Sequence, residues 1–133
     1  MKGFHDDIEK RTIGNSDFRR VLYTGGHLQL VLMTLQPGEA IGAEVHEDRD
    51  QFFRFEKGRG QVDIDQNCYE VGDGSGVVVP AGARHNVRNT GTEPLRLYTL
   101  YGPPEHKDGV VQSTKADAEA RHRHEEWDGA TTE

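Results

Sequence analysis

The chain has 133 residues, 33% of them hydrophobic, and its 16 Lys and Arg against 23 Asp and Glu give a net charge of −7. This length predicts a single domain, and the lack of a basic surplus disfavours a nucleic-acid binder. A single cysteine, Cys68, excludes an intrachain disulfide. The single cysteine, the polar N-terminus and the lack of an apolar run of membrane-spanning length together predict a cytoplasmic protein. We expect it to make no contact with membranes.

Short strand-like segments follow one another along most of the chain, and turns rich in Gly, Asn and Asp separate them. Strands are predicted at residues 18–23, 27–35, 43–46, 51–56, 61–64, 68–71, 77–80, 85–89 and 95–101. The segment 27–35 is apolar at both odd and even positions, so both of its faces should be covered. Strands at this spacing with no helices between them predict a sandwich or a barrel.

Helical character is confined to the end of the chain. Ser113 and Thr114 offer a hydroxyl cap and Asp117 an acid in the first turn, ahead of an alanine-rich run. From Arg121 onward the sequence is highly charged and is expected to fray. We divide the single domain into an N-terminal strand and arm (1–26), a core (27–104) and a C-terminal extension (105–133).

Polar, metal-ligating residue types cluster in two of the predicted strands and the turns beside them. Glu44 and His46 are two apart on a strand, so their side chains leave the same face. Gln51 follows a polar turn and begins the next strand, where it can lie beside them. Phe53 and Phe55 share the parity of Gln51, which indicates that this face points into an apolar interior.

His85 begins another strand after a Pro-Ala-Gly loop. Two imidazoles, one carboxylate and one amide oxygen form a mixed N/O set that suits Zn, Mn, Fe, Ni or Co. A buried glutamate is costly unless it is paired or bound to a metal. The residues alone do not bring His85 to the other three, and a metal-free barrel whose interior polar groups bond one another remains the alternative.

The two segments resemble the paired motifs of the cupin superfamily, and the chain is similar to its small single-domain members. The second motif is matched at every fixed position, namely Gly74, Pro80, Gly82, His85 and Asn89. The first is matched at Gly38, His46 and Gly58, but Glu44 stands in place of the first histidine and Gln51 in place of the glutamate. The resemblance covers about residues 28–101.

This resemblance implies an all-β fold, the double-stranded β-helix (jelly-roll) barrel, here with a short C-terminal helical tail. It also implies a homodimer and a divalent transition metal held by Glu44, His46, Gln51 and His85. The carboxylate has moved within the ligand set, so two histidines and one acid remain. Gln51 adds no charge and should bind metal more weakly than a glutamate, or it could instead hydrogen-bond Glu44.

Further residues could line the pocket. We take Phe53, Phe55, Arg84, Tyr98 and His106 as the candidates, with Arg84 in the loop before His85 and His106 just after the last barrel strand. Tyr98 and Tyr101 lie on opposite faces of one strand, so at most one of them can line it. Arg54 should point outward, and His27, His122 and His124 are expected to be solvated.

Three classes of function remain open. The first is a metal-dependent isomerase or lyase acting on a small polar substrate such as a sugar or keto acid, with Glu44 or a pocket residue moving the proton. The second is a non-haem iron dioxygenase, because its ligand set is two histidines and a carboxylate. The third is a non-catalytic barrel that binds a small molecule.

Overall fold

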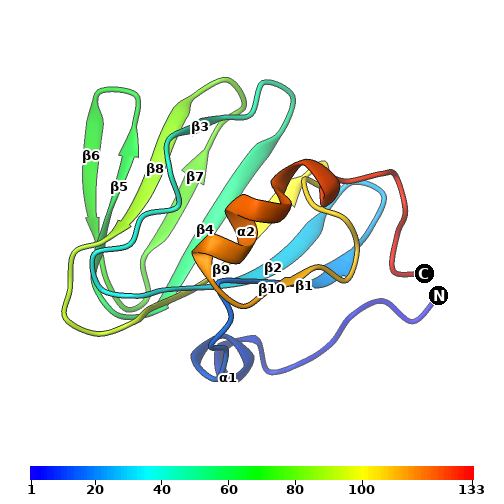
Figure 1. Ribbon diagram of the computed structural model, residues 1–133, viewed down its shortest axis with the longest axis horizontal. Coiled ribbons are helices and arrows are strands. Elements are labelled where there is room, and N and C mark those ends of the chain that lie inside the picture. The colour runs from blue at the N-terminus through cyan, green and yellow to red at the C-terminus, as the bar shows by residue number, and fades with distance from the viewer.

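Ten β-strands form two antiparallel sheets that share one hydrophobic core (Figure 1). The computed structural model describes the backbone of residues 1–133 and every side chain except that of Arg123. The strands are β1 (Arg19–Thr24), β2 (Gln29–Leu35), β3 (Glu44–Val45), β4 (Asp50–Lys57), β5 (Gly60–Ile64), β6 (Asn67–Val71), β7 (Gly76–Val79), β8 (Arg84–Asn89), β9 (Leu95–Gly102) and β10 (Val111–Gln112).

The larger sheet has the order β10-β1-β2-β9-β4-β7 and the smaller one the order β3-β8-β5-β6. The nine predicted strands are all present, with ends shifted by one or two residues. The short strand β10 was not predicted, because two residues carry no alternating pattern. The predicted all-β fold with a short C-terminal helix is therefore confirmed.

The core lies between the inner faces of the two sheets. Buried and half-buried residues alternate along β4 and β9, so every second side chain of these strands points inward. The inward side chains include Phe53, Phe55, Leu95 and Leu97 from the larger sheet, and Val62 and Val87 from the smaller one. Gln51 and Thr99 share this inward parity near one end of the barrel, where polar side chains replace apolar ones.

Both faces of β2 are covered, as its sequence predicts. Helix α1 (Ile8–Ile13) and the turn after it lie against the outer face of the larger sheet, where Leu32 is buried. Asn15 fixes this turn by donating to the hydroxyl of Thr34 at 3.0 Å and accepting from it at 2.8 Å. Helix α1 was missed because its six residues are too few to show a helical period.

The C-terminal region folds back onto the barrel. Helix α2 (Lys115–Arg121) forms as predicted, with the Thr114 hydroxyl accepting from the amide of Asp117 at 3.1 Å, and the 3₁₀ turn η1 (His122–His124) follows it. That the chain frays after Arg121 stays a prediction. The amide of Trp127 donates to the Glu105 carbonyl at 3.0 Å, and such backbone bonds attach the tail to the barrel. None of the described helices is long and apolar enough to cross a membrane.

Candidate metal centre

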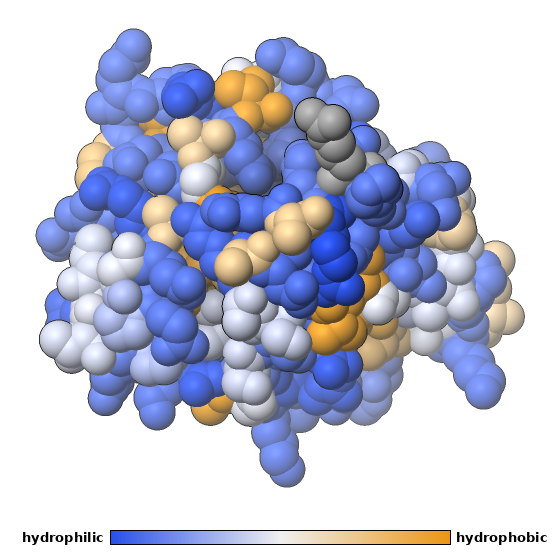
Figure 2. Space-filling view, viewed as in Figure 1, coloured by the Kyte–Doolittle hydropathy of each residue, from blue (hydrophilic) through white to orange (hydrophobic). Residues whose placement is uncertain are grey.

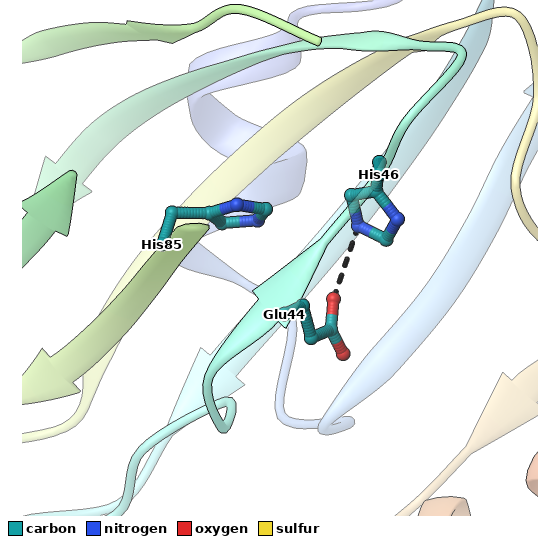
Figure 3. Close-up of side chains that lie close together, drawn as sticks. All are labelled: Glu44, His46 and His85. Carbon is teal, nitrogen blue, oxygen red and sulfur yellow. Dashed lines mark ion pairs between the residues drawn. The ribbon is translucent and has the colours of Figure 1, made fainter. Parts of the chain in front are cut away.

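Glu44, His46 and His85 come together on the inner face of the smaller sheet (Figure 3). Each offers one ligand atom, and these atoms all lie within 4.8 Å of one another. Glu44 lies directly opposite His85 across the β3–β8 pair, and directly opposed residues leave the sheet on the same side. His46 directly follows β3 and shares the parity of Glu44. Its ring centroid lies 5.3 Å from that of His85.

The loop before β8 holds the two histidine segments together. Gly82 has φ +88°, a backbone conformation that favours glycine, and its amide donates to the carbonyl of His46 at 2.9 Å. Nδ1 of His85 lies 3.2 Å from the carbonyl oxygen of Ala83 in the same loop. This contact assigns the proton of His85 to Nδ1 and leaves Nε2 as the free ligand atom.

His46 is oriented by a second carboxylate. Its Nδ1 lies 3.4 Å from Oε2 of Glu105, and Arg49 pairs with the same carboxylate. A carboxylate on the far nitrogen of a histidine is the usual way in which proteins orient a metal-binding imidazole. Nε2 of His46 lies 3.1 Å from Oε2 of Glu44, but without hydrogen-bond geometry, and this buried nitrogen has no hydrogen-bond partner among the described side chains.

The charges of the cluster favour metal binding by Glu44 and His85 at neutral pH, whereas a proton competes with the metal at His46. Burial raises the pKa of the Glu44 carboxyl, but His46 and Arg19 outweigh burial and leave this pKa below its ordinary value. Burial lowers the pKa of His85, so His85 is neutral and its lone pair is available. For His46 burial also lowers the pKa, but the carboxylates of Glu44 and Glu105 reverse the effect and raise it.

The family model described as "Cupin domain" matches residues 31–101, which include all three clustered residues. The chain is a cupin. It is 48% identical over 128 residues to the uncharacterized protein YrkC of Bacillus subtilis, covering 90% of this chain and 67% of that one. It is 38% identical over 109 residues to the uncharacterized protein L612 of Acanthamoeba polyphaga mimivirus, covering 79% and 68%.

Among solved structures, the BH2720 protein of Bacillus halodurans superposes on this cupin with a TM-score of 0.88 at 48% sequence identity. The match covers 90% of this chain and 95% of that one.

Gln51 reaches the same interior from the other sheet of the cupin barrel. It is 3% exposed, and its Nε2 donates to the Thr99 hydroxyl at 3.0 Å. Its Oε1 is buried and has no hydrogen-bond partner among the described side chains. A buried amide oxygen without a partner is costly, and a metal ligand role for Gln51 would remove that cost. Whether Gln51 binds metal directly stays a prediction.

The predicted pocket residues divide between the inner and outer faces of the cupin. Phe53 packs near the cluster, with its ring centroid 6.2 Å from that of His85, and Phe55 lies deeper and stacks on Phe53. His106 is buried, and its Nε2 lies 3.3 Å from the Tyr101 hydroxyl.

Two of the pocket predictions need correction. Arg84 is exposed and neighbours His85, so strand alternation turns its side chain outward. Tyr98 has the outward parity of β9, whereas Tyr101 is 3% exposed with its ring centroid 6.0 Å from that of His46. Of the two tyrosines, it is therefore Tyr101 that faces the cluster.

Sequence reasoning missed two charged residues beside the cluster. Arg19 is 7% exposed and points inward from β1. It lies two residues before the apolar Val21, so strand alternation could have indicated that both side chains share the inner face. Glu105 comes from the segment after β9 and carries no local pattern that predicts its contact with His46. Its only sequence signal is its position next to His106.

Proposed function

We propose that this cupin is a metal-dependent isomerase or lyase that acts on a small polar substrate such as a sugar or a keto acid. The observation that carries the proposal is the convergence of Glu44, His46 and His85, with ligand atoms within 4.8 Å of one another. One buried polar atom in this region, Oε1 of Gln51, lacks a hydrogen-bond partner among the described side chains. A cation bound there would satisfy it, and would replace the proton between His46 and Glu44.

The donor set fits a divalent transition metal. Two imidazole nitrogens, a carboxylate and an amide oxygen are ligands that Zn, Mn, Fe, Ni or Co accept. The contacts of Nδ1 in both histidines leave Nε2 as the ligand atom in each. A metal bound to these residues would supply Lewis-acid polarisation of a substrate carbonyl oxygen.

Glu44 is the proposed proton acceptor. Its lowered pKa keeps it ionised at neutral pH, and 36% of its side chain is exposed, which leaves it accessible to a substrate. A carboxylate next to a polarised carbonyl can remove the proton from the adjacent carbon and return it to a neighbouring atom. Isomerisation and elimination both require this proton transfer.

Residues around the cluster would position the substrate and limit water. The Tyr101 hydroxyl stays protonated because burial raises its pKa, so it can donate a hydrogen bond. Phe53 covers one side of His85. The interior thus combines a small number of polar groups with apolar walls, as is typical of small-molecule sites.

A non-haem iron dioxygenase is the second candidate. It is favoured by one observation, the presence of two histidines and one carboxylate in the cluster, which is the ligand composition of many such enzymes. The requirement for oxygen separates the two candidates, because isomerisation and elimination consume none.

The first experiment is elemental analysis by plasma mass spectrometry of untagged protein prepared without chelators. We expect about one transition-metal ion per chain. His46→Ala and His85→Ala should each abolish stoichiometric metal, whereas His27→Ala, at an exposed position, should retain it. Equal metal contents in all four proteins, or no metal after incubation with each ion, would contradict the proposal and favour a non-catalytic binding barrel.

A second experiment tests the reaction class. The zinc-loaded protein is incubated anaerobically with aldoses, ketoses and keto acids, and product formation is followed by NMR. Turnover without oxygen supports an isomerase or lyase. Turnover only with Fe(II), accompanied by oxygen uptake, assigns the dioxygenase instead.

A further inference from the structure

A groove of about 300 Å³ opens beside the candidate metal centre, between β1 and α2. Glu44 and Arg19 both line it, while Lys115, Glu119 and His122 belong to the side formed by α2 and the start of η1. The volume is at the lower end of the range for small-molecule sites. Because Glu44 belongs to both, a ligand in the groove would reach the cluster.

Figure 2 shows the face that α2 crosses, with Figure 1 giving the position of the helix. This face is largely hydrophilic, with hydrophobic residues in small separate patches. It does not resemble an apolar docking surface, and a polar ligand would meet polar side chains on its way to the groove.

Arg19 is the unusual residue of the groove. It is 7% exposed, and one guanidinium nitrogen donates to Oε1 of Gln112 at 2.7 Å. Its Nε is buried without a hydrogen-bond partner, and Arg19 forms no ion pair of 4.0 Å or less with any described carboxylate. A buried guanidinium has five N–H donors and is costly to leave uncompensated. The fold therefore keeps a positive charge here without a direct acidic partner.

The other charges of the groove largely cancel. Nζ of Lys115 lies 3.9 Å from Oε1 of Glu119 on the next turn of α2. Glu44 is the carboxylate of the candidate metal centre, and metal binding would engage its negative charge. Once a metal engages Glu44, Arg19 has no other unpaired carboxylate among the described residues of the groove to attract it.

We propose that Arg19 binds the carboxylate of a small anionic substrate, so that the enzyme acts on keto acids or acidic sugars and not on neutral sugars. This inference rests on the proposed function, because it supplies the substrate class for that site. A guanidinium binds a carboxylate through two parallel hydrogen bonds, which fix its orientation as well as its position. The anchored molecule would extend along the groove toward Glu44.

The test compares ligands that differ by a carboxylate, using the zinc-loaded wild-type protein at constant ionic strength. Glucuronate is compared with glucose, and pyruvate with acetone, by isothermal titration calorimetry. We expect at least one anionic probe to bind about tenfold or more tightly than its neutral counterpart, as a charge-assisted hydrogen bond would provide. No preference in either pair overturns the inference.

Variants then assign the preference to Arg19. Arg19→Gln, which keeps a donor for Gln112, should lose the preference, and Arg19→Lys should retain only part of it. The control Arg54→Gln removes a more exposed arginine on the outer face of β4 and should leave the preference intact. A preference that persists in a folded Arg19→Gln protein overturns the inference. If Arg19→Gln does not fold, Arg19→Lys and the wild-type protein still test the inference. An anion preference that is absent in the wild type, or undiminished in Arg19→Lys, would overturn it.

Metal content separates this inference from the proposed function. Arg19 is not among the clustered ligands, so Arg19→Gln should hold the same amount of zinc as the wild type. Normal zinc content with no anion preference refutes the inference alone. An anion preference in a protein that never binds metal refutes the proposed function but supports the anion site.

Discussion

Glu44 and His85 lie directly opposite each other across the antiparallel pair β3–β8. This pairing positions a carboxylate and an imidazole on one face without help from any loop. His46 joins them because it follows Glu44 by two residues and because its carbonyl accepts the amide of Gly82. The cluster is therefore built on backbone pairing, which fixes ligand positions more firmly than side-chain contacts alone.

Replacing Glu105 by glutamine should weaken metal binding although Glu105 lies outside the cluster. Its carboxylate lies 3.4 Å from Nδ1 of His46, so its charge orients the imidazole and makes Nε2 a stronger donor. We expect affinity for zinc to fall about 10- to 100-fold, as is typical for such changes. Calorimetric zinc titration measures the change. Glu70→Gln, on the exposed face of β6, is the matched control, and equal losses in the two variants would contradict the argument.

Gln51→Glu should tighten metal binding. The buried Oε1 of Gln51 lacks a hydrogen-bond partner, and a carboxylate in its place would add a negative charge close to the metal. The attraction exceeds the burial cost only if the oxygen binds the metal directly, in which case affinity should rise by at least about tenfold. Competition with a chelator of known affinity measures it. Unchanged or weaker binding would show that Gln51 supports the site without ligating.

Strand alternation made much of the site predictable. The shared parity of Gln51, Phe53 and Phe55 correctly predicted an inward face, and all three are buried. The spacing of Glu44 and His46 likewise placed two clustered side chains together. These predictions succeeded because the period of two in a strand is a local property of the backbone.

The contacts between distant segments could not be predicted from the residues alone. The approach of Glu105 to His46 depends on how the chain turns after β9, and Arg19 reaches Glu44 only because β1 and β3 belong to different sheets of one barrel. The resemblance to cupins indicated that His85 lies near the other ligand residues, but it gave no information about Glu105 or Arg19. The prediction that Tyr98 lines the pocket was wrong because alternation along a strand divides its residues between two faces but does not say which face is the inner one.

In the metal-free protein, the two clustered histidines should titrate on opposite sides of the ordinary pKa of 6.5. Burial lowers both pKa values, but the carboxylates of Glu44 and Glu105 raise that of His46 above 6.5, whereas that of His85 stays below. His46 therefore stabilises the fold below pH 6.5, and this contribution is lost as pH rises through its pKa. The contribution of His85 has the opposite sign, so stability is lost as pH falls from 6.5 through its lowered pKa.

Imidazole NMR titration of the chelator-treated protein tests this ordering. Glu44→Gln removes the nearest carboxylate and should lower the pKa of His46. The exposed His27 provides a reference resonance in the same sample. A His46 that titrates below His85, or one that is unaffected by Glu44→Gln, would contradict the ion pair.

Gly82→Ala should destabilise the protein and weaken the metal site together. At φ +88° an added Cβ strains the backbone, although its nearest neighbour, Oε2 of Glu47, is 3.9 Å away and leaves room for a methyl group. Backbone strain alone therefore predicts a loss of about 1–2 kcal/mol in the free energy of unfolding, measurable by urea denaturation. Because the Gly82 amide holds the carbonyl of His46, the same strain should displace the two histidines and lower zinc affinity.

Gly26→Ala is the matched control for that variant. Gly26 is exposed, has no positive φ and no neighbour within 4 Å of an added Cβ, so alanine there should leave stability and zinc affinity near their wild-type values. If Gly82→Ala lost stability but kept full zinc affinity, the Gly82–His46 hydrogen bond would serve the fold alone. The site would then depend on the β3–β8 pairing, and breaking the pairing of Glu44 with His85 would become the decisive change.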